Sequence, residues 1–160
     1  MRTTPSSFSS GVRTDLGPKI STSIAYNNID GLNKQLSFKG QINRRDNLNS
    51  LDDERREKSK SLIEYLTILN YSEKYLFDSD WSLGISLSQS RKRYFSFDAD
   101  IQKTSYTIGN DITDWLKFSF TQQLETISQY DTTVEREHGH FQIGSVTPEL
   151  TFDFRNNRIN

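Results

Sequence analysis

The stretch that decides the fold is residues 32–45, which read LNKQLSFKGQINRR. One set of alternate positions includes Leu32, Leu36, Phe38 and Ile42, whereas every position between them is polar. Successive side chains of a β-strand point to opposite faces of the sheet. A period of two therefore predicts a strand with one apolar face and one polar face.

The same period recurs along the chain, most clearly in residues 81–87, 116–124 and 146–154. Clusters of Gly, Asn, Asp and Ser separate these segments and indicate turns. We predict an all-β, antiparallel, up-and-down fold of about eight strands, with residues 92–102 extending the fifth and sixth strands as a hairpin arm. The predicted strands are 6–13, 18–27, 32–45, 61–73, 81–91, 103–112, 116–129 and 141–155.

The composition limits the kinds of protein that this chain can be. Hydrophobic residues make up 32% of its 160 residues and the mean hydropathy is -0.74, which is little apolar mass for a core of its own. With 20 Lys and Arg against 21 Asp and Glu, we expect no nucleic-acid partner. The absence of cysteine excludes a disulfide scaffold. No apolar run approaches the roughly 18 residues of a transmembrane helix, and the first residues do not read as a signal peptide.

Two architectures fit strands with one apolar and one polar face. In a soluble β-sandwich the polar face meets water, whereas in a transmembrane barrel the apolar face meets lipid. Several predicted strands exceed the roughly 10 residues that cross a bilayer when tilted, which favours the barrel. Connections also alternate between tight and long. The long ones are a charged loop at 46–60, with room for a short helix, and a polar loop at 132–140 that contains both histidines.

Aromatic residues gather where one rim of such a barrel is expected. If residues 14–17 form an outer turn, the end of the second strand, the end of the fourth and the starts of the fifth and seventh meet at the opposite rim. Amphipathic rings favour the headgroup level of a bilayer, although aromatics are also common at strand ends in general. The residues at these places are Tyr26, Tyr71, Tyr75, Phe77, Trp81 and Trp115, of which we predict Tyr26, Tyr75, Trp81 and Trp115 as interfacial aromatics.

Three short motifs resemble those of the outer-membrane-protein assembly factor superfamily, the BamA/TamA-type surface-antigen β-barrels. Residues 26–33, YNNIDGLN, resemble the family's "N-L-x-G-x-G" turn. Residues 71–77, YSEKYLF, look like "Y-x-E-P-x-L-F", with Lys74 in place of the proline. Residues 147–157, TPELTFDFRNN, resemble "T-P-x-L-x-x-D-x-R-D-N". The matching positions, which we expect to be structural, are Asn28, Gly31, Tyr71, Glu73, Phe77, Asp153 and Arg155.

The resemblance implies that residues 1–160 are the N-terminal half of a barrel with sixteen strands, integral to the bacterial outer membrane rather than to that of an organelle. The periplasmic POTRA modules and the later half of such a barrel have no counterpart here. The implied function is insertion and folding of other outer-membrane β-barrel proteins. The implied partners are lipid, nascent barrel proteins, the remainder of the barrel with its POTRA modules, and accessory lipoproteins.

In this family the first strand acts as a lateral gate, because it pairs weakly with the last strand and offers a free edge to a client strand. The corresponding residues here are Ser7, Phe8, Ser9, Ser10, Gly11 and Val12, a short segment of small side chains. A secretion pore or passive channel of the same barrel type is one alternative, and a soluble β-sandwich binding domain is another. No catalytic, cofactor or metal motif stands out, so we expect no enzyme activity.

Overall fold

A computed structural model describes residues 7–13, 17–44, 63–94, 97–130 and 139–153. The strands are β1 (Ser7–Arg13), β2 (Gly17–Ile29), β3 (Lys34–Arg44), β4 (Ile63–Glu73), β5 (Trp81–Arg93), β6 (Asp98–Thr113), β7 (Leu116–Tyr130) and β8 (His140–Phe152). A 3-10 turn, η2 (Leu76–Asp78), lies between β4 and β5. Among the described residues, none of the helical segments is long and apolar enough to cross a membrane.

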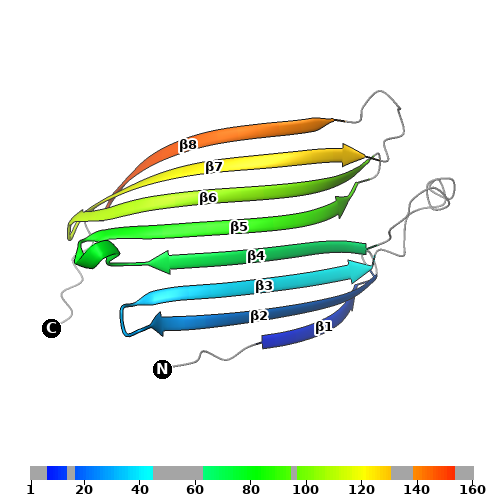
Figure 1. Cartoon of the computed structure of the whole chain (residues 1–160), viewed down its shortest axis with the longest axis horizontal. Coiled ribbons are helices and arrows are strands. Elements are labelled where there is room, and N and C mark those ends of the chain that lie inside the picture. The colour runs from blue at the N-terminus through cyan, green and yellow to red at the C-terminus, as the bar shows by residue number, and fades with distance from the viewer. Residues whose placement is uncertain (1–6, 14–16, 45–62, 95–96, 131–138, 154–160) are drawn as a thin grey trace.

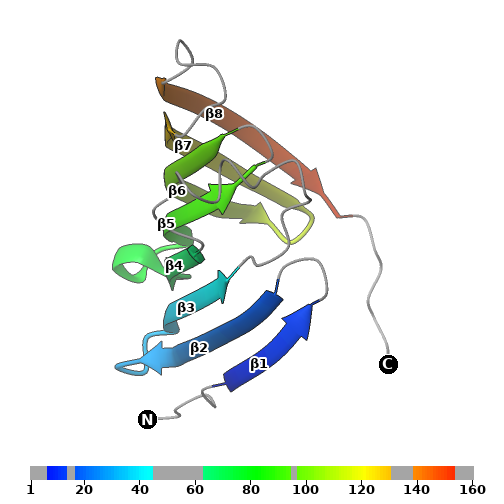
Figure 2. The same ribbon diagram turned by 90° about the vertical axis from the view of Figure 1, so that its right-hand side faces the viewer.

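All eight strands form one antiparallel sheet in the order β1 to β8, so each strand pairs with its neighbours in sequence (Figure 1). This confirms the predicted up-and-down order. The described strands do not form two packed sheets, as the sandwich alternative requires. Figure 2 shows that the sheet curves into an open arc with β1 at one end and β8 at the other. The sheet is not closed, so the barrel remains a prediction.

The connections define two rims of the sheet. The turn rim holds the short connections at 30–33, 74–80 and 114–115, at the left of Figure 1. The opposite edge, which we call the loop rim, holds the connections at 14–16, 45–62, 94–97 and 131–139. The two longest connections are therefore on one rim, as predicted. The expected charged loop at 46–60 lies outside the described residues, as does nearly all of the polar loop at 132–140.

Several strands are longer than predicted or displaced by a few residues. Strand β2 continues to Ile29 because Asn28, with φ of 56°, forms a bulge between Asn27 and Ile29. Strands β5 and β6 continue to Arg93 and from Asp98, which confirms the predicted hairpin arm. Polar residues remain in strand here because they pair across it, as Arg91 does with Asp100 (2.7 Å) and Arg93 with Asp98 (3.3 Å). Strand β8 ends at Phe152 rather than at 155, and the residues beyond Asp153 are not described.

The sheet has almost no core. Ala99 is the one buried hydrophobic residue among those described, and large apolar side chains along all eight strands are exposed. On β2 to β7 most side chains of the polar face are half-buried, although they are small or polar. A curved sheet crowds the side chains on its concave side, so the apolar face is the convex one.

The turn between β2 and β3 depends on Asn28. Its carbonyl accepts a hydrogen bond from the Gly31 amide (3.3 Å) and its Oδ1 accepts one from the Asn33 amide (2.9 Å). The residue itself is in the left-handed region, which asparagine tolerates better than most residues.

Replacing Asn28 should therefore destabilise the sheet. Asn28→Ala is expected to lower the free energy of unfolding by about 1–2 kcal/mol, because it loses the side-chain hydrogen bond and disfavours the backbone conformation. Asn28→Gly loses only the hydrogen bond and should cost about half as much. Urea denaturation measures both. Equal stability of the two variants would contradict the assigned backbone conformation.

Candidate functional site

Cross-strand register collects the apolar side chains on one face of the sheet. For example, Ile24, Phe38, Leu69 and Leu87 are neighbours in one row from β2 to β5, and the row continues through Thr104 to Leu124 on β7. Side chains opposite one another across a strand pair lie on the same face. No described element covers this face. Exposed apolar patches of this extent mark surfaces that contact other molecules or lipid.

The apolar residues form a band that runs obliquely across the sheet. One row joins Tyr26 on β2 to Tyr71 on β4 and ends at Val146 on β8. On β2 this row lies at the turn-rim end of the apolar run 20–26. On β8 it lies at the opposite, loop-rim end of the apolar run 146–152. The band therefore shifts by six residues along the strands over six strand steps.

This shift sets the angle between the strands and the band. Six residues of strand rise about 20 Å and six strand spacings measure about 29 Å, so the strands are tilted by about 35° from the normal to the band. Strands of outer-membrane barrels are tilted by roughly 35–45° from the membrane normal. An apolar band flat in a membrane would thus give the strands the tilt of a barrel.

The predicted aromatics follow the border of this band at the turn rim. Tyr26 and Tyr71 end the band on β2 and β4, and Trp81 ends it on β5, four residues beyond the partner of Tyr71. Trp115 lies in the turn between β6 and β7, and its ring stacks on Phe152 of the apolar face with centroids 6.4 Å apart. Tyr75, in the β4–β5 connection, is also exposed at this rim. The five residues therefore lie at or near the turn-rim border of the band.

The other face of the sheet is polar and internally hydrogen-bonded. The hydroxyls of Thr107 and Thr121 lie 2.9 Å apart across β6 and β7, and Asn43 Nδ2 donates to Glu64 Oε2 at 2.6 Å. Apolar residues enter this face near the loop rim, where Leu66 and Ile127 share a row. Strand β4 therefore has apolar side chains on both faces, and its sequence does not show a clear period of two.

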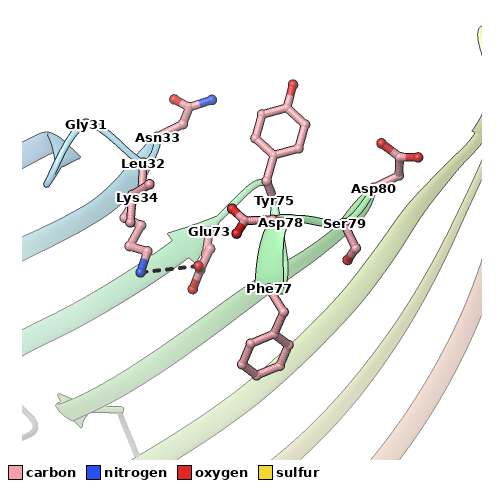
Figure 3. A pocket seen from close by; sticks show the side chains of 10 residues that line it. All are labelled: Gly31, Leu32, Asn33, Lys34, Glu73, Tyr75, Phe77, Asp78, Ser79 and Asp80. Carbon is pink, nitrogen blue, oxygen red and sulfur yellow. Dashed lines mark ion pairs between the residues drawn. The ribbon is translucent and has the colours of Figure 1, made fainter.

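At the turn rim the motif segments meet around a cleft of about 580 Å³. Figure 3 shows Gly31 and Lys34 on one side and the β4–β5 connection on the other. Lys34 Nζ lies 3.4 Å from Glu73 Oε1. The Tyr71 hydroxyl donates to Glu73 Oε2 at 2.7 Å. Phe77 is 91% exposed and has φ of 54°, a conformation that bulky residues seldom adopt.

The motif residues therefore occupy turn, bulge and ion-pair positions. The third motif reaches the same rim, where the Asp153 amide donates to the Trp115 carbonyl (2.8 Å). Arg155 lies outside the described residues. The described part of the chain holds no cluster of three or more His, Asp or Glu side chains that could bind a metal ion.

The gate segment is the shortest strand and pairs only with β2 among the described strands. Ser7 and Ser9 each lie 2.6 Å, hydroxyl to hydroxyl, from Ser23 and Ser21 of β2. Phe8 is 72% exposed, and a Cβ added at Gly11 would meet no heavy atom within 4 Å. The side chain of Val12 is not described. This strand therefore has few packing contacts to hold it.

The hydrogen-bond pattern identifies which backbone groups face the open edges. Gln129 N donates to Gly139 O and Asp153 N donates to Trp115 O, both at 2.8 Å, at the two ends of the β7–β8 ladder. Bonded and non-bonded pairs alternate in an antiparallel ladder. Even-numbered residues of β8, including Pro148, thus direct their backbone groups away from β7. The same alternation can be followed through the strand pairings from β7 to β1. It shows that Phe8, Ser10 and Val12 direct their backbone groups toward the open edge of β1.

Comparison of the chain with known protein families, with curated proteins and with solved structures found no match. The resemblance to the assembly factors therefore stays a prediction from the three sequence motifs.

We expect the apolar face to tolerate a new charged side chain poorly and the polar face to tolerate it well. In phospholipid vesicles, Phe120→Arg in the middle of the band on β7 should lower the free energy of unfolding of the naturally occurring protein by about 2–4 kcal/mol. Ser119→Arg, its neighbour on the polar face, places the cation beside Glu149 and should cost less than about 1 kcal/mol. Urea titration of vesicle-bound protein measures both. Equal losses would show that the apolar face does not meet lipid.

Proposed function

We propose that this chain is half of a bacterial outer-membrane β-barrel, with its apolar face in lipid and its polar face toward the barrel interior. The observation that carries the proposal is the uncovered apolar band, which crosses the strands at the angle that a barrel requires and is edged by aromatic side chains. A bilayer covers such a face without a second sheet. The hydrogen-bonded Ser, Thr and Asn side chains of the other face suit a water-filled interior.

The open edges support a barrel completed by further strands. Backbone N–H and C=O groups inside lipid must be paired, because no water reaches them there. Both β1 and β8 carry such groups on their outer sides within the described sheet. We therefore propose that the remainder of the barrel pairs with these edges, and that POTRA modules and accessory lipoproteins act with it as in the family that the motifs resemble.

Within this barrel we propose that β1 is a lateral gate for the insertion of other outer-membrane proteins. Three residues present their backbone groups on its open edge, and Phe8 is its one described large apolar side chain. A strand with so few bonds to lose can exchange partners more readily than the longer strands. A client strand that adds to this edge satisfies its own backbone groups before it enters lipid.

A secretion pore or passive channel is the second candidate, and the polar face favours it equally. The two differ at β1, since a pore needs no exchange of strand partners there. Crosslinking at this strand therefore separates the candidates.

We expect Ser9→Cys to form a disulfide with a cysteine in the edge strand of a nascent barrel protein, in cells that make the protein as it naturally occurs. Two cysteines can bridge only when their Cα atoms are within about 7 Å, which a strand added to β1 satisfies. Ser21→Cys is the matched control, because Ser21 is the partner of Ser9 on β2 and lies one strand farther from the client.

Products are detected as higher-mass bands that disappear on reduction. Crosslinks at position 9 but not at position 21 support the gate. Crosslinks of position 9 to the chain's own closing strand alone, during active insertion of clients, would contradict it and favour the pore.

A further inference from the structure

A polar patch lies on the same face as the apolar band, over β5 to β8 toward the loop rim. Its first row consists of Gln89, Gln102, Thr126 and Gln142, which are cross-strand partners. The next row toward the rim consists of Arg91, Asp100, Ser128 and His140. We call these eight residues the amide patch.

The oblique course of the band determines where the amide patch lies relative to a bilayer. On β5 and β7 the band ends at Leu87 and Leu124, and the first row of the patch follows two residues later, about 7 Å along the strands. On β2 and β3 the rows that correspond to the patch still contain Ile20 and Ile42. The patch therefore begins where the apolar band ends, at the expected headgroup level.

The charges of the patch are balanced within it. Arg91 Nε and one terminal nitrogen donate to the two carboxylate oxygens of Asp100, at 2.7 and 2.8 Å. The guanidinium also lies 5.6 Å from the ring centroids of Tyr65 and Tyr130. An anionic phosphate headgroup is bound by cations that are not neutralised by other groups. This pair instead presents a fixed, neutral assembly of donors and acceptors.

The exposed members of the patch are hydrogen-bonding and uncharged. Gln89, Gln102 and Gln142 are exposed, and each amide carries two N–H donors and an acceptor. Gln89 Nε2 donates one hydrogen to the Tyr65 hydroxyl (3.2 Å) and keeps the other free. Ser128 Oγ lies 3.0 Å from Nδ1 of the exposed His140, which fixes a further polar pair beside them. Side chains of this kind, held on a rigid sheet, match the hydroxyl groups of sugars better than they match phosphates or acyl chains.

We propose that the amide patch binds the saccharide headgroups of glycolipids, at the level of the bilayer surface directly beyond the lipid-facing band. This inference depends on the proposed membrane placement of the apolar face. It adds a partner of defined chemistry, a neutral polyhydroxyl headgroup, to one sector of the barrel rim.

The test uses the protein as it naturally occurs, with the strands that pair with β1 and β8. It compares the folding equilibrium in three kinds of vesicle: zwitterionic phospholipid alone, phospholipid with a glycolipid that carries core sugars, and phospholipid with phosphatidylglycerol. The patch variant is Gln89→Ala/Gln102→Ala/Gln142→Ala. The matched control is Gln35→Ala/Gln41→Ala/Gln123→Ala, three glutamines of the polar face.

We expect the glycolipid to raise the folding equilibrium constant of the unmodified chain and of the control. In vesicles with the glycolipid, the folding equilibrium constant of the patch variant should be about tenfold below that of the unmodified chain, since each of the three lost amide hydrogen bonds contributes modestly. In phospholipid alone the two constants should be equal. An undiminished gain in the patch variant, or an equal gain with phosphatidylglycerol, would overturn the proposal. Failure to fold in every vesicle would instead overturn the membrane placement on which it depends.

Discussion

The structure depends on one constraint, which is that an eight-stranded sheet carries an apolar face that no described part of the chain covers. A sheet of this size in water would expose rows of Leu, Ile and Phe side chains at a large free-energy cost. Among the residues that the structure describes, Ala99 is the one hydrophobic residue that is buried. The stabilising surroundings must therefore come from outside the described sheet, and the low hydrophobic content of the sequence follows from this arrangement.

The oblique band connects that constraint to the placement of individual residues. Because the band moves along the strands from β2 to β8, the aromatic border also moves, from Tyr26 to Trp115. Because of the same shift, the loop-rim ends of β5 and β6 lie outside the apolar band. Ion pairs can occupy those ends, as Arg91 with Asp100 and the buried Arg93 with Asp98 do.

The sequence was sufficient to predict the strands and their order, because side-chain alternation is local and antiparallel neighbours follow one another along the chain. It also predicted the β5–β6 arm, but not the cross-strand ion pairs of Arg91 with Asp100 and Arg93 with Asp98, since these depend on register. The oblique band was missed for the same reason, because it appears only when all seven pairings are known. The gate residues were located by resemblance alone, and Arg155 and most of the two long loops lie outside the described residues.

Pro148 has a consequence for whatever strand lies beside β8. Its backbone nitrogen faces the open side and carries no hydrogen, so the facing carbonyl of an antiparallel neighbour receives no bond there. In the apolar zone water cannot replace that bond cheaply. A neighbour pairs best when a bulge or a local bend falls opposite Pro148, and a slip of two residues in either direction would lose that match. The missing N–H donor at Pro148 thus favours one register for the neighbouring strand, because the other residues of this edge do not distinguish one register from another.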